Sequence, residues 1–133
     1  MDNINLKKVY DAKKYGVTKK GEIKNPLGFR ERKLDDFIKW FNQTEFDKGC
    51  HYCGTTNERC AELYKLRPKA TRGGKRGRRL ELDRADPFGS YDNLDNLVWC
   101  CYWCNNAKSN FFTASEFKAI ATAIGLALSD IKN

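Results

Sequence analysis

Two Cys-x-x-Cys pairs restrict the fold of this 133-residue chain more than any other feature. The first pair is Cys50 and Cys53, and the second is Cys101 and Cys104. Two such pairs are a common way to present four thiolates to a tetrahedral zinc ion. The spacing therefore predicts a structural zinc site that joins two distant parts of the chain.

Six cysteines also permit a disulfide scaffold, because their number is even. Disulfides are typical of exported proteins, and the polar, lysine-rich start of this sequence has no secretory signal. No stretch approaches the roughly 20 apolar residues of a membrane helix. We therefore expect an intracellular protein, cytoplasmic or, in a eukaryotic host, nuclear. The sequence leaves open whether Cys100 or Cys101 is the zinc ligand, and Cys60 is left over.

Positive charge is concentrated in one segment of a chain whose net charge is +8. The segment RPKATRGGKRGRR, residues 67–79, is rich in basic residues and has no acidic one. Such a cluster predicts phosphate binding, although a solvated loop that aids solubility is the alternative. The candidate DNA-binding residues are Arg67, Lys69, Arg72, Lys75, Arg76, Arg78 and Arg79, with Lys108 further along the chain.

Hydrophobic periodicity predicts a mixture of helices and short strands. A helix is expected over 32–46, because apolar residues recur there with helical spacing. Alternation predicts strands over 80–84 and 97–101, with Leu80 and Leu82 on the face opposite Asp83. Further helices are expected after a cap at 55–57 and over 103–110. The predicted buried face of the helix at 32–46 consists of Leu34, Phe37, Ile38 and Phe41.

A capping box, Thr113 to Glu116, predicts a final helix that ends near residue 127. Its expected buried face consists of Phe117, Ile120, Ala121 and Ile124. We divide the chain into an N-terminal arm with an amphipathic helix, residues 1–47, and a core with the C-terminal helix, residues 48–133. The predicted class is α+β.

Oxygen donors beside the cysteines indicate a second kind of metal site. Asp83 ends the first strand and offers a carboxylate, and Asn105 follows the second cysteine pair and offers an amide oxygen. Mg²⁺ and similar hard ions prefer such ligands. Asn96 is expected to pin the loop between the strands by hydrogen bonds to its backbone.

The order of these motifs resembles the HNH (ββα-metal) endonucleases over roughly residues 48–127. The matching motifs are Cys50-x-x-Cys53, Asp83-Arg84, Asn96-Leu97, Cys101-x-x-Cys104-Asn105 and Lys108. The resemblance implies a small zinc-stabilised ββα-metal core with flanking helices, and a catalytic Mg²⁺ or Mn²⁺ at Asp83 and Asn105. Arg84 departs from the pattern, because the family normally carries its general-base histidine there.

That departure changes which residue can react. Arg84 keeps its proton, so it can bind phosphate or stabilise negative charge but cannot activate water. His51 is a candidate base, and Tyr52 is a candidate nucleophile. The sequence resembles the restriction enzymes of this family in which Asp-Arg stands in place of Asp-His. That resemblance implies Tyr52 as the reacting residue. Packing or phosphate contact remains the alternative role for both.

The expected function is a metal-dependent DNA endonuclease that hydrolyses phosphodiester bonds. We expect sequence-specific cleavage of double-stranded DNA by a homodimer, of restriction or homing type, because one small site cuts one strand. The alternatives are a structure-selective nuclease or nickase and a non-catalytic, zinc-stabilised DNA-binding module. Lys108 is expected to bind phosphate or to be an exposed surface lysine.

Overall fold

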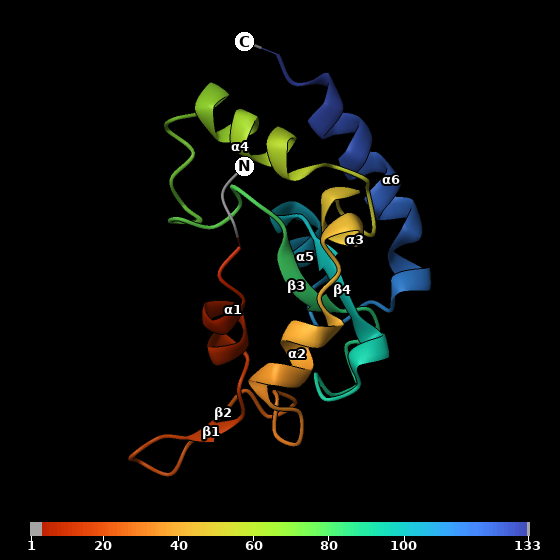
Figure 1. Cartoon of the computed structure of the whole chain (residues 1–133). Coiled ribbons are helices and arrows are strands. Elements are labelled where there is room, and N and C mark those ends of the chain that lie inside the picture. The colour runs from red at the N-terminus through yellow and green to blue at the C-terminus, as the bar shows by residue number, and fades with distance from the viewer. Residues whose placement is uncertain (1–3, 133) are drawn as a thin grey trace.

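Two short antiparallel strands lie at the centre of the computed structural model, which describes residues 4–132 (Figure 1). They are β3 (Glu81–Arg84) and β4 (Leu97–Cys100), paired so that Asp83 lies opposite Val98. Helix α5 (Tyr102–Lys108) follows β4 almost directly and packs against β3. This ββα unit, with helices around it, confirms the predicted α+β class and both central strands.

The alternation in β3 separates an apolar from a polar face. Leu80 and Leu82 are 0% and 2% exposed and belong to the hydrophobic core. On the other face, Glu81 bonds to Asn105 and Asp83 pairs with Lys108, both residues of α5. The polar face of β3 is therefore covered by the helix that follows the second cysteine pair.

The loop between β3 and β4 is held by Asn96, as predicted. Its amide oxygen accepts a bond from Asp86 N at 2.8 Å, and its amide nitrogen donates to Asp86 O at 2.9 Å. A 3₁₀ turn, η1 (Leu94–Asn96), brings the residue into place. This pairing fixes the backbone just beyond the end of β3.

The prediction of one continuous helix over 32–46 is wrong. The structure has two helices, α2 (Leu34–Trp40) and α3 (Gln43–Asp47), with an extended backbone at Phe41. Asn42 caps α3, since its side chain accepts a bond from Glu45 N at 3.2 Å. An asparagine that caps a new helix competes with continuation of the preceding one. Ile38, predicted to be core, is 46% exposed.

The later helices follow the sequence signals more closely. Thr56 caps α4 (Asn57–Leu66), and Thr113 and Glu116 form the predicted capping box of α6. Helix α6 (Ala114–Asp130) runs past the predicted end near 127, and Ile120 of its expected buried face is 37% exposed. Within residues 4–132, no helix has both the length and the apolar character needed to cross a membrane.

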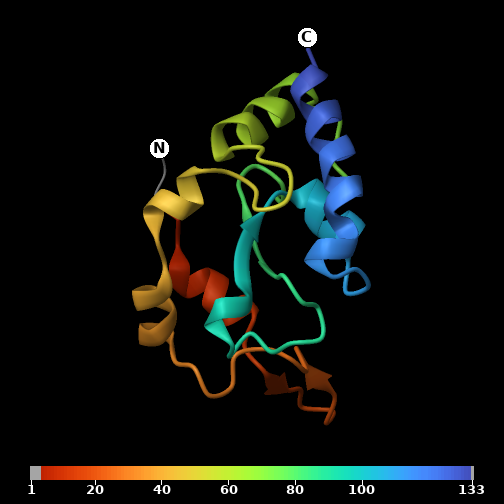
Figure 2. The ribbon, with the colours of Figure 1, turned by 90° about the vertical axis from the view of Figure 1, so that its right-hand side faces the viewer.

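Helices α4 and α6 meet at the upper edge of the molecule in Figures 1 and 2. Arg59 of α4 donates to Leu128 O at 2.8 Å and to Ile131 O at 2.7 Å. These carbonyls lie at the end of α6, where they have no partner within the helix. The contact ties the C-terminal helix to the segment after the first cysteine pair.

The N-terminal part forms α1 (Leu6–Ala12) and a hairpin of β1 (Gly16–Val17) and β2 (Ile23–Lys24). Aromatic packing links it to the centre: Phe29 stacks on Tyr10 with ring centroids 4.8 Å apart, and Phe37 lies 6.4 Å from Trp99 of β4. The division at residue 47 stays a prediction, and its outer limits, residues 1–3 and 133, lie outside the described part.

Candidate metal centre and active site

The four cysteines of the two predicted pairs come together. Their sulfur atoms all lie within 4.8 Å of one another, and Cys53 Sγ is 3.7 Å from Cys101 Sγ. Four sulfurs at about 2.3 Å from a tetrahedral zinc would be roughly 3.8 Å apart. Cys50, Cys53, Cys101 and Cys104 are therefore close enough to bind a metal ion, and their soft sulfur ligands fit zinc.

Backbone N–H groups support these thiolates. Cys50 Sγ accepts from the N–H groups of Tyr52 and Cys53, and Cys101 Sγ accepts from Cys104 N, all at 3.4 Å. The neighbouring sulfurs of Cys101 and Cys104 lower the pKa of Cys50 to about 7. The pKa of Cys53 is also lowered by its neighbours in the cluster, whereas the pKa values of Cys101 and Cys104 are raised, so the metal-binding thiolate is favoured at Cys50 and Cys53.

The two remaining cysteines lie outside this cluster. Cys60 and Cys100 are fully buried, and burial raises the pKa of Cys60 to about 12 and that of Cys100 well above its usual value. Both are therefore thiols packed in the core. Of the two ligand candidates that the sequence left open, the structure places Cys101 in the cluster.

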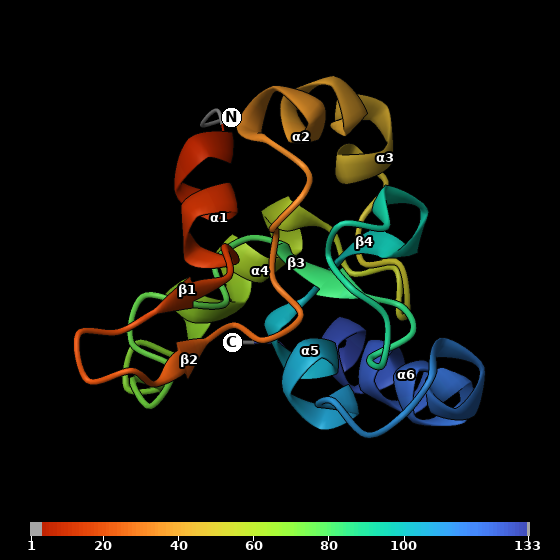
Figure 3. The same cartoon turned by 90° about the horizontal axis from the view of Figure 1, so that it is seen from below.

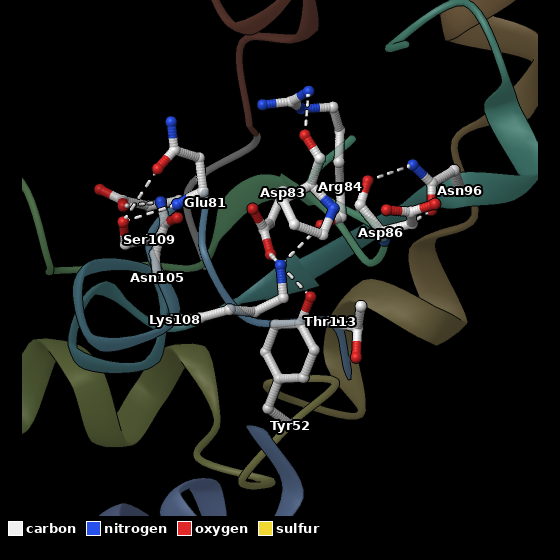
Figure 4. Close-up of polar contacts among 12 residues, drawn as sticks. Tyr52, Glu81, Asp83, Arg84, Asp86, Asn96, Asn105, Lys108, Ser109 and Thr113 are labelled. Atoms are coloured by element: carbon white, nitrogen blue, oxygen red, sulfur yellow. Dashed lines mark hydrogen bonds and ion pairs between the residues drawn. The ribbon is translucent and has the colours of Figure 1, made fainter. Parts of the chain in front are cut away.

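Tyr52, from within the first cysteine pair, meets Asp83 of β3 and Lys108 of α5 (Figure 4). Tyr52 Oη donates to Asp83 Oδ2 at 2.6 Å, and Lys108 Nζ lies 3.3 Å from the same carboxylate oxygen. Burial and the Asp83 carboxylate together raise the pKa of the Tyr52 phenol. In this arrangement the phenol is a hydrogen-bond donor, held by the carboxylate.

Lys108 lies enclosed within the protein. The side chain is 0% exposed, and Nζ donates to Arg84 O at 2.8 Å. The alternative of an exposed surface lysine is therefore wrong, and the role of phosphate ligand stays a prediction. In this structure Lys108 compensates the charge of Asp83 within the protein.

Asn105 is held by a carboxylate that the sequence analysis did not single out. Asn105 Nδ2 donates to Glu81 Oε1 at 2.9 Å, and Arg76 binds both oxygens of Glu81 at 2.7 and 2.9 Å. The signal was available, because alternation places Glu81 on the same face of β3 as Asp83. The three bonds fix which way the Asn105 amide points.

Two oxygens on this face remain available to a hard cation. Asp83 Oδ2 and Asn105 Nδ2 are engaged, whereas Asp83 Oδ1 and Asn105 Oδ1 accept no hydrogen bond from any residue between 4 and 132. Carboxylate and amide oxygens are suitable ligands for Mg²⁺ or Mn²⁺. The donor chemistry at these two residues therefore fits the predicted second metal.

Arg84 holds the loop that follows β3. Its guanidinium donates to Pro87 O and Gly89 O, both at 2.8 Å, and lies 5.0 Å from the centre of the Tyr91 ring. The arginine follows Asp83 on the strand, so its side chain leaves the opposite face of β3. Its contacts are thus with protein carbonyls, and its predicted catalytic role stays a prediction.

His51 and the basic segment are exposed. The His51 ring meets the Tyr52 ring edge-on at 5.2 Å and lines a hollow of about 520 Å³ beside β4. Arg76 lies over the Tyr102 ring at 4.8 Å, and Arg78 lies over the Tyr64 ring at 4.5 Å. These aromatic contacts order part of the basic segment on α4 and α5, while its seven basic side chains stay exposed.

Among solved structures, the chain is similar to PacI, a rare-cutting HNH restriction endonuclease that perturbs DNA. The TM-score is 0.57 and the sequence identity 29%, over 74% of this chain and 66% of the PacI chain. No protein-family model and no curated protein matches the sequence. The matched region thus spans just under two thirds of the PacI chain, and the likeness confirms the resemblance to HNH endonucleases that the motifs indicated.

Proposed function

We propose that this protein is a metal-dependent DNA endonuclease that hydrolyses phosphodiester bonds. The observation that carries the proposal is the contact between Tyr52 Oη and Asp83 Oδ2 at 2.6 Å, on a fold similar to that of an HNH restriction endonuclease. It joins a nucleophilic hydroxyl to a carboxylate that has a second oxygen available for a metal ion.

Two metal sites belong to the proposal. Zinc would be held by Cys50, Cys53, Cys101 and Cys104 and would stabilise the fold. Mg²⁺ or Mn²⁺ would be held by Asp83 and Asn105, where it would supply positive charge to a scissile phosphate and to the leaving oxygen. Glu81 would keep the Asn105 amide oriented for that role.

Tyr52 is the proposed reacting residue. Tyr52 Oη would give its proton to Asp83 Oδ2 and attack phosphorus, which forms a phosphotyrosyl bond as the bond from phosphorus to the 3′ oxygen breaks. The 3′ oxygen would leave with the bonding electrons and take up a proton, and water would then hydrolyse the phosphotyrosyl bond to restore Tyr52. His51, whose ring lies against the Tyr52 ring, is the alternative, as a base that takes a proton from water. Arg84 would stabilise phosphate charge only after release from the carbonyls of Pro87 and Gly89.

Double-strand cleavage would require two sites. We therefore propose a homodimer that cuts double-stranded DNA at a specific sequence, with restriction or homing as its role. The basic segment would contact backbone or bases. A DNA substrate also makes an intracellular site of action the expected one, and a structure-selective nuclease or nickase remains the alternative within this class.

One observation favours a second candidate, a DNA-binding module without catalysis. Lys108 already supplies a positive charge 3.3 Å from Asp83, which weakens the need of that carboxylate for a cation. In such a module Asp83 and Lys108 would be a buried pair that stabilises the fold. The two candidates differ in whether DNA is cut when Mg²⁺ is supplied.

The test is incubation of purified protein with a long DNA of known sequence, with and without Mg²⁺. Tyr52→Phe and His51→Ala variants are compared on the same gel. We expect discrete, Mg²⁺-dependent fragments from the wild type. The cleavage rate of Tyr52→Phe should be lower by a factor of at least about 100. His51→Ala should keep most of the activity.

The remaining outcomes separate the alternatives. Loss in His51→Ala alone would move the chemistry to an activated water. Cleavage of branched but not linear duplex DNA would identify a structure-selective nuclease. Tight binding without cleavage of either DNA, in Mg²⁺ or Mn²⁺, would contradict the enzyme and favour the binding module.

A further inference from the structure

A cleft of about 1060 Å³ separates α1 from the basic segment, outside the contact between Tyr52 and Asp83. In Figure 1 the loop that joins α4 to β3 lies above α1, and Figure 3 shows α1 and its hairpin on the side of the molecule opposite α6. The cleft is lined from both of these segments and reaches Glu81 and Asn105. We call it the α1 cleft.

The rim of the α1 cleft is strongly basic. It receives side chains from two segments that are distant in sequence: Lys8, Lys13, Lys75, Arg76, Arg78 and Arg79. Among residues 4–132, the acidic residues that line it are Glu58 and Glu81, and Arg76 already neutralises Glu81 through two hydrogen bonds. A concave surface with one sign of charge concentrates ligands of the opposite sign. The charge of the rim therefore favours a polyanion as the ligand of this cleft.

The floor of the cleft is apolar, which narrows the kind of polyanion. Ile4 and Val9 line it from the side of α1, and Ala61 and Leu82 line it from α4 and β3. Phosphates of an intact duplex surround paired bases, which have no use for an apolar floor. A single strand, in contrast, presents unpaired bases, whose faces can leave water against aliphatic side chains while the phosphates stay with the basic rim.

We infer that the α1 cleft binds one strand of nucleic acid, with phosphates along the basic rim and unpaired bases against the apolar floor. The inference rests on the proposed nuclease function for its choice of nucleic acid. It assigns one side of the strand-binding surface to α1 and the residue that follows it, through Lys8 and Lys13. It also leads the strand to Glu81 and Asn105, and so to the polar face of β3.

Binding measured without added Mg²⁺ or Mn²⁺ tests this inference without any cleavage, and no chelator is used, because it would remove the zinc proposed for the cysteine cluster. A fluorescently labelled single-stranded oligonucleotide and a duplex of the same length are titrated with protein at several salt concentrations. The cleft variant is Lys8→Gln with Lys13→Gln. The matched control is Lys7→Gln with Lys14→Gln, which removes the same charge from the same segment, at two residues that do not line the cleft.

We expect the cleft variant to bind the single strand at least about tenfold more weakly at low salt. Its plot of log affinity against log salt should be less steep by about 1.4, because each lost phosphate contact removes about 0.7 from the slope. The control should stay within about threefold of the wild type. Thermal melting of both variants should stay close to that of the wild type, because Lys7, Lys8 and Lys14 are exposed and Lys13 is only half-buried.

Equal losses in the two variants would overturn the inference, because charge alone would then explain the binding. So would a wild type that binds the duplex more tightly than the strand, with the duplex losing affinity in the cleft variant. The cleavage assay is independent: a protein that never cuts DNA but loses strand binding in the cleft variant would contradict the proposed function and leave the cleft assignment standing.

Discussion

A lysine side chain without exposed surface needs nearby negative charge or acceptors to repay the loss of hydration. Lys108 finds both, in Asp83 Oδ2 at 3.3 Å and Arg84 O at 2.8 Å. Removing one partner of such a buried pair leaves the charge of the other partner uncompensated. Lys108 is therefore expected to determine the stability of the site as well as its chemistry.

Lys108→Met should lower the free energy of unfolding by about 3–5 kcal/mol, because it leaves the Asp83 carboxylate buried without its cation. Urea denaturation followed by far-UV circular dichroism measures this. The control is Lys118→Met, which removes an exposed lysine of α6 and should cost less than about 0.5 kcal/mol. Asp83→Asn combined with Lys108→Met should cost less than the sum of the single changes. An unchanged midpoint for Lys108→Met would contradict the buried pair.

The sequence identified most of the candidate site residues, but it did not identify the groups that these residues contact. Strand alternation predicted that Asp83 faces away from the leucines, and the Asn96 pin followed from the turn chemistry of the amide. Lys108 lies three residues after Asn105, so both share the face of α5 that covers β3. The burial of Lys108 could not be predicted, because the sequence does not tell whether the helix face that carries a lysine is exposed or covered.

At the scale of elements, the boundaries depend on local competition between hydrogen bonds. Thr113 and Glu116 satisfy each other at the start of α6, and the capping box was legible in the sequence. Asn42 ends one helix and begins another, a choice that periodicity over 32–46 does not reveal. The exposure of Ile38 and Ile120 depends on how the helices pack against one another. The hydrophobic periodicity of a single helix does not determine that packing.

Asp92 joins the segment between the hairpin and α2 to the loop after β3. Its carboxylate accepts from the backbone N–H groups of Arg30 and Arg32 at 3.0 Å and of Glu31 at 3.1 Å. Burial raises the pKa of Asp92, but these three bonds outweigh it and lower the pKa below its usual value. The contact therefore stabilises the fold while the carboxylate is ionised.

Asp92→Asn should lower the free energy of unfolding at pH 7 by about 1 kcal/mol, because an amide N–H₂ would face a backbone donor. A lowered pKa in the folded state gives stability above the unfolded value of about 3.9, and this stability is lost as the pH falls through the folded value. The difference between wild type and variant should therefore shrink as the pH falls below about 3.9, the unfolded value. Urea titrations from pH 7 to 2.5 measure it, with Asp95→Asn in the same loop as control. A difference that stays constant with pH would contradict the ionised contact.

At the scale of the whole molecule, the four-cysteine cluster closes a long loop. Cys53 and Cys101 are 48 positions apart, and the chain between them contains α4, the basic segment and β3. One metal ion would thus fix the relative placement of Tyr52, which lies within the first cysteine pair, and of α5, which begins after Cys101. The site and the cluster are parts of one arrangement, and sequence spacing was enough to predict it.

Removal of the metal should therefore disorder the site and not only loosen one end of the chain. We expect about one zinc per chain, and treatment with a strong chelator should lower the melting temperature by more than about 10 °C, since metal binding to such a site is coupled to folding. Cys101→Ala should lose the zinc, whereas Cys100→Ala, its buried neighbour outside the cluster, should keep it. Zinc content after gel filtration, together with melting curves, distinguishes the two variants. Zinc retained in Cys101→Ala but lost in Cys100→Ala would reverse the ligand assignment, and an unchanged melting temperature of the metal-free protein would show that the two cysteine pairs are held together by packing alone.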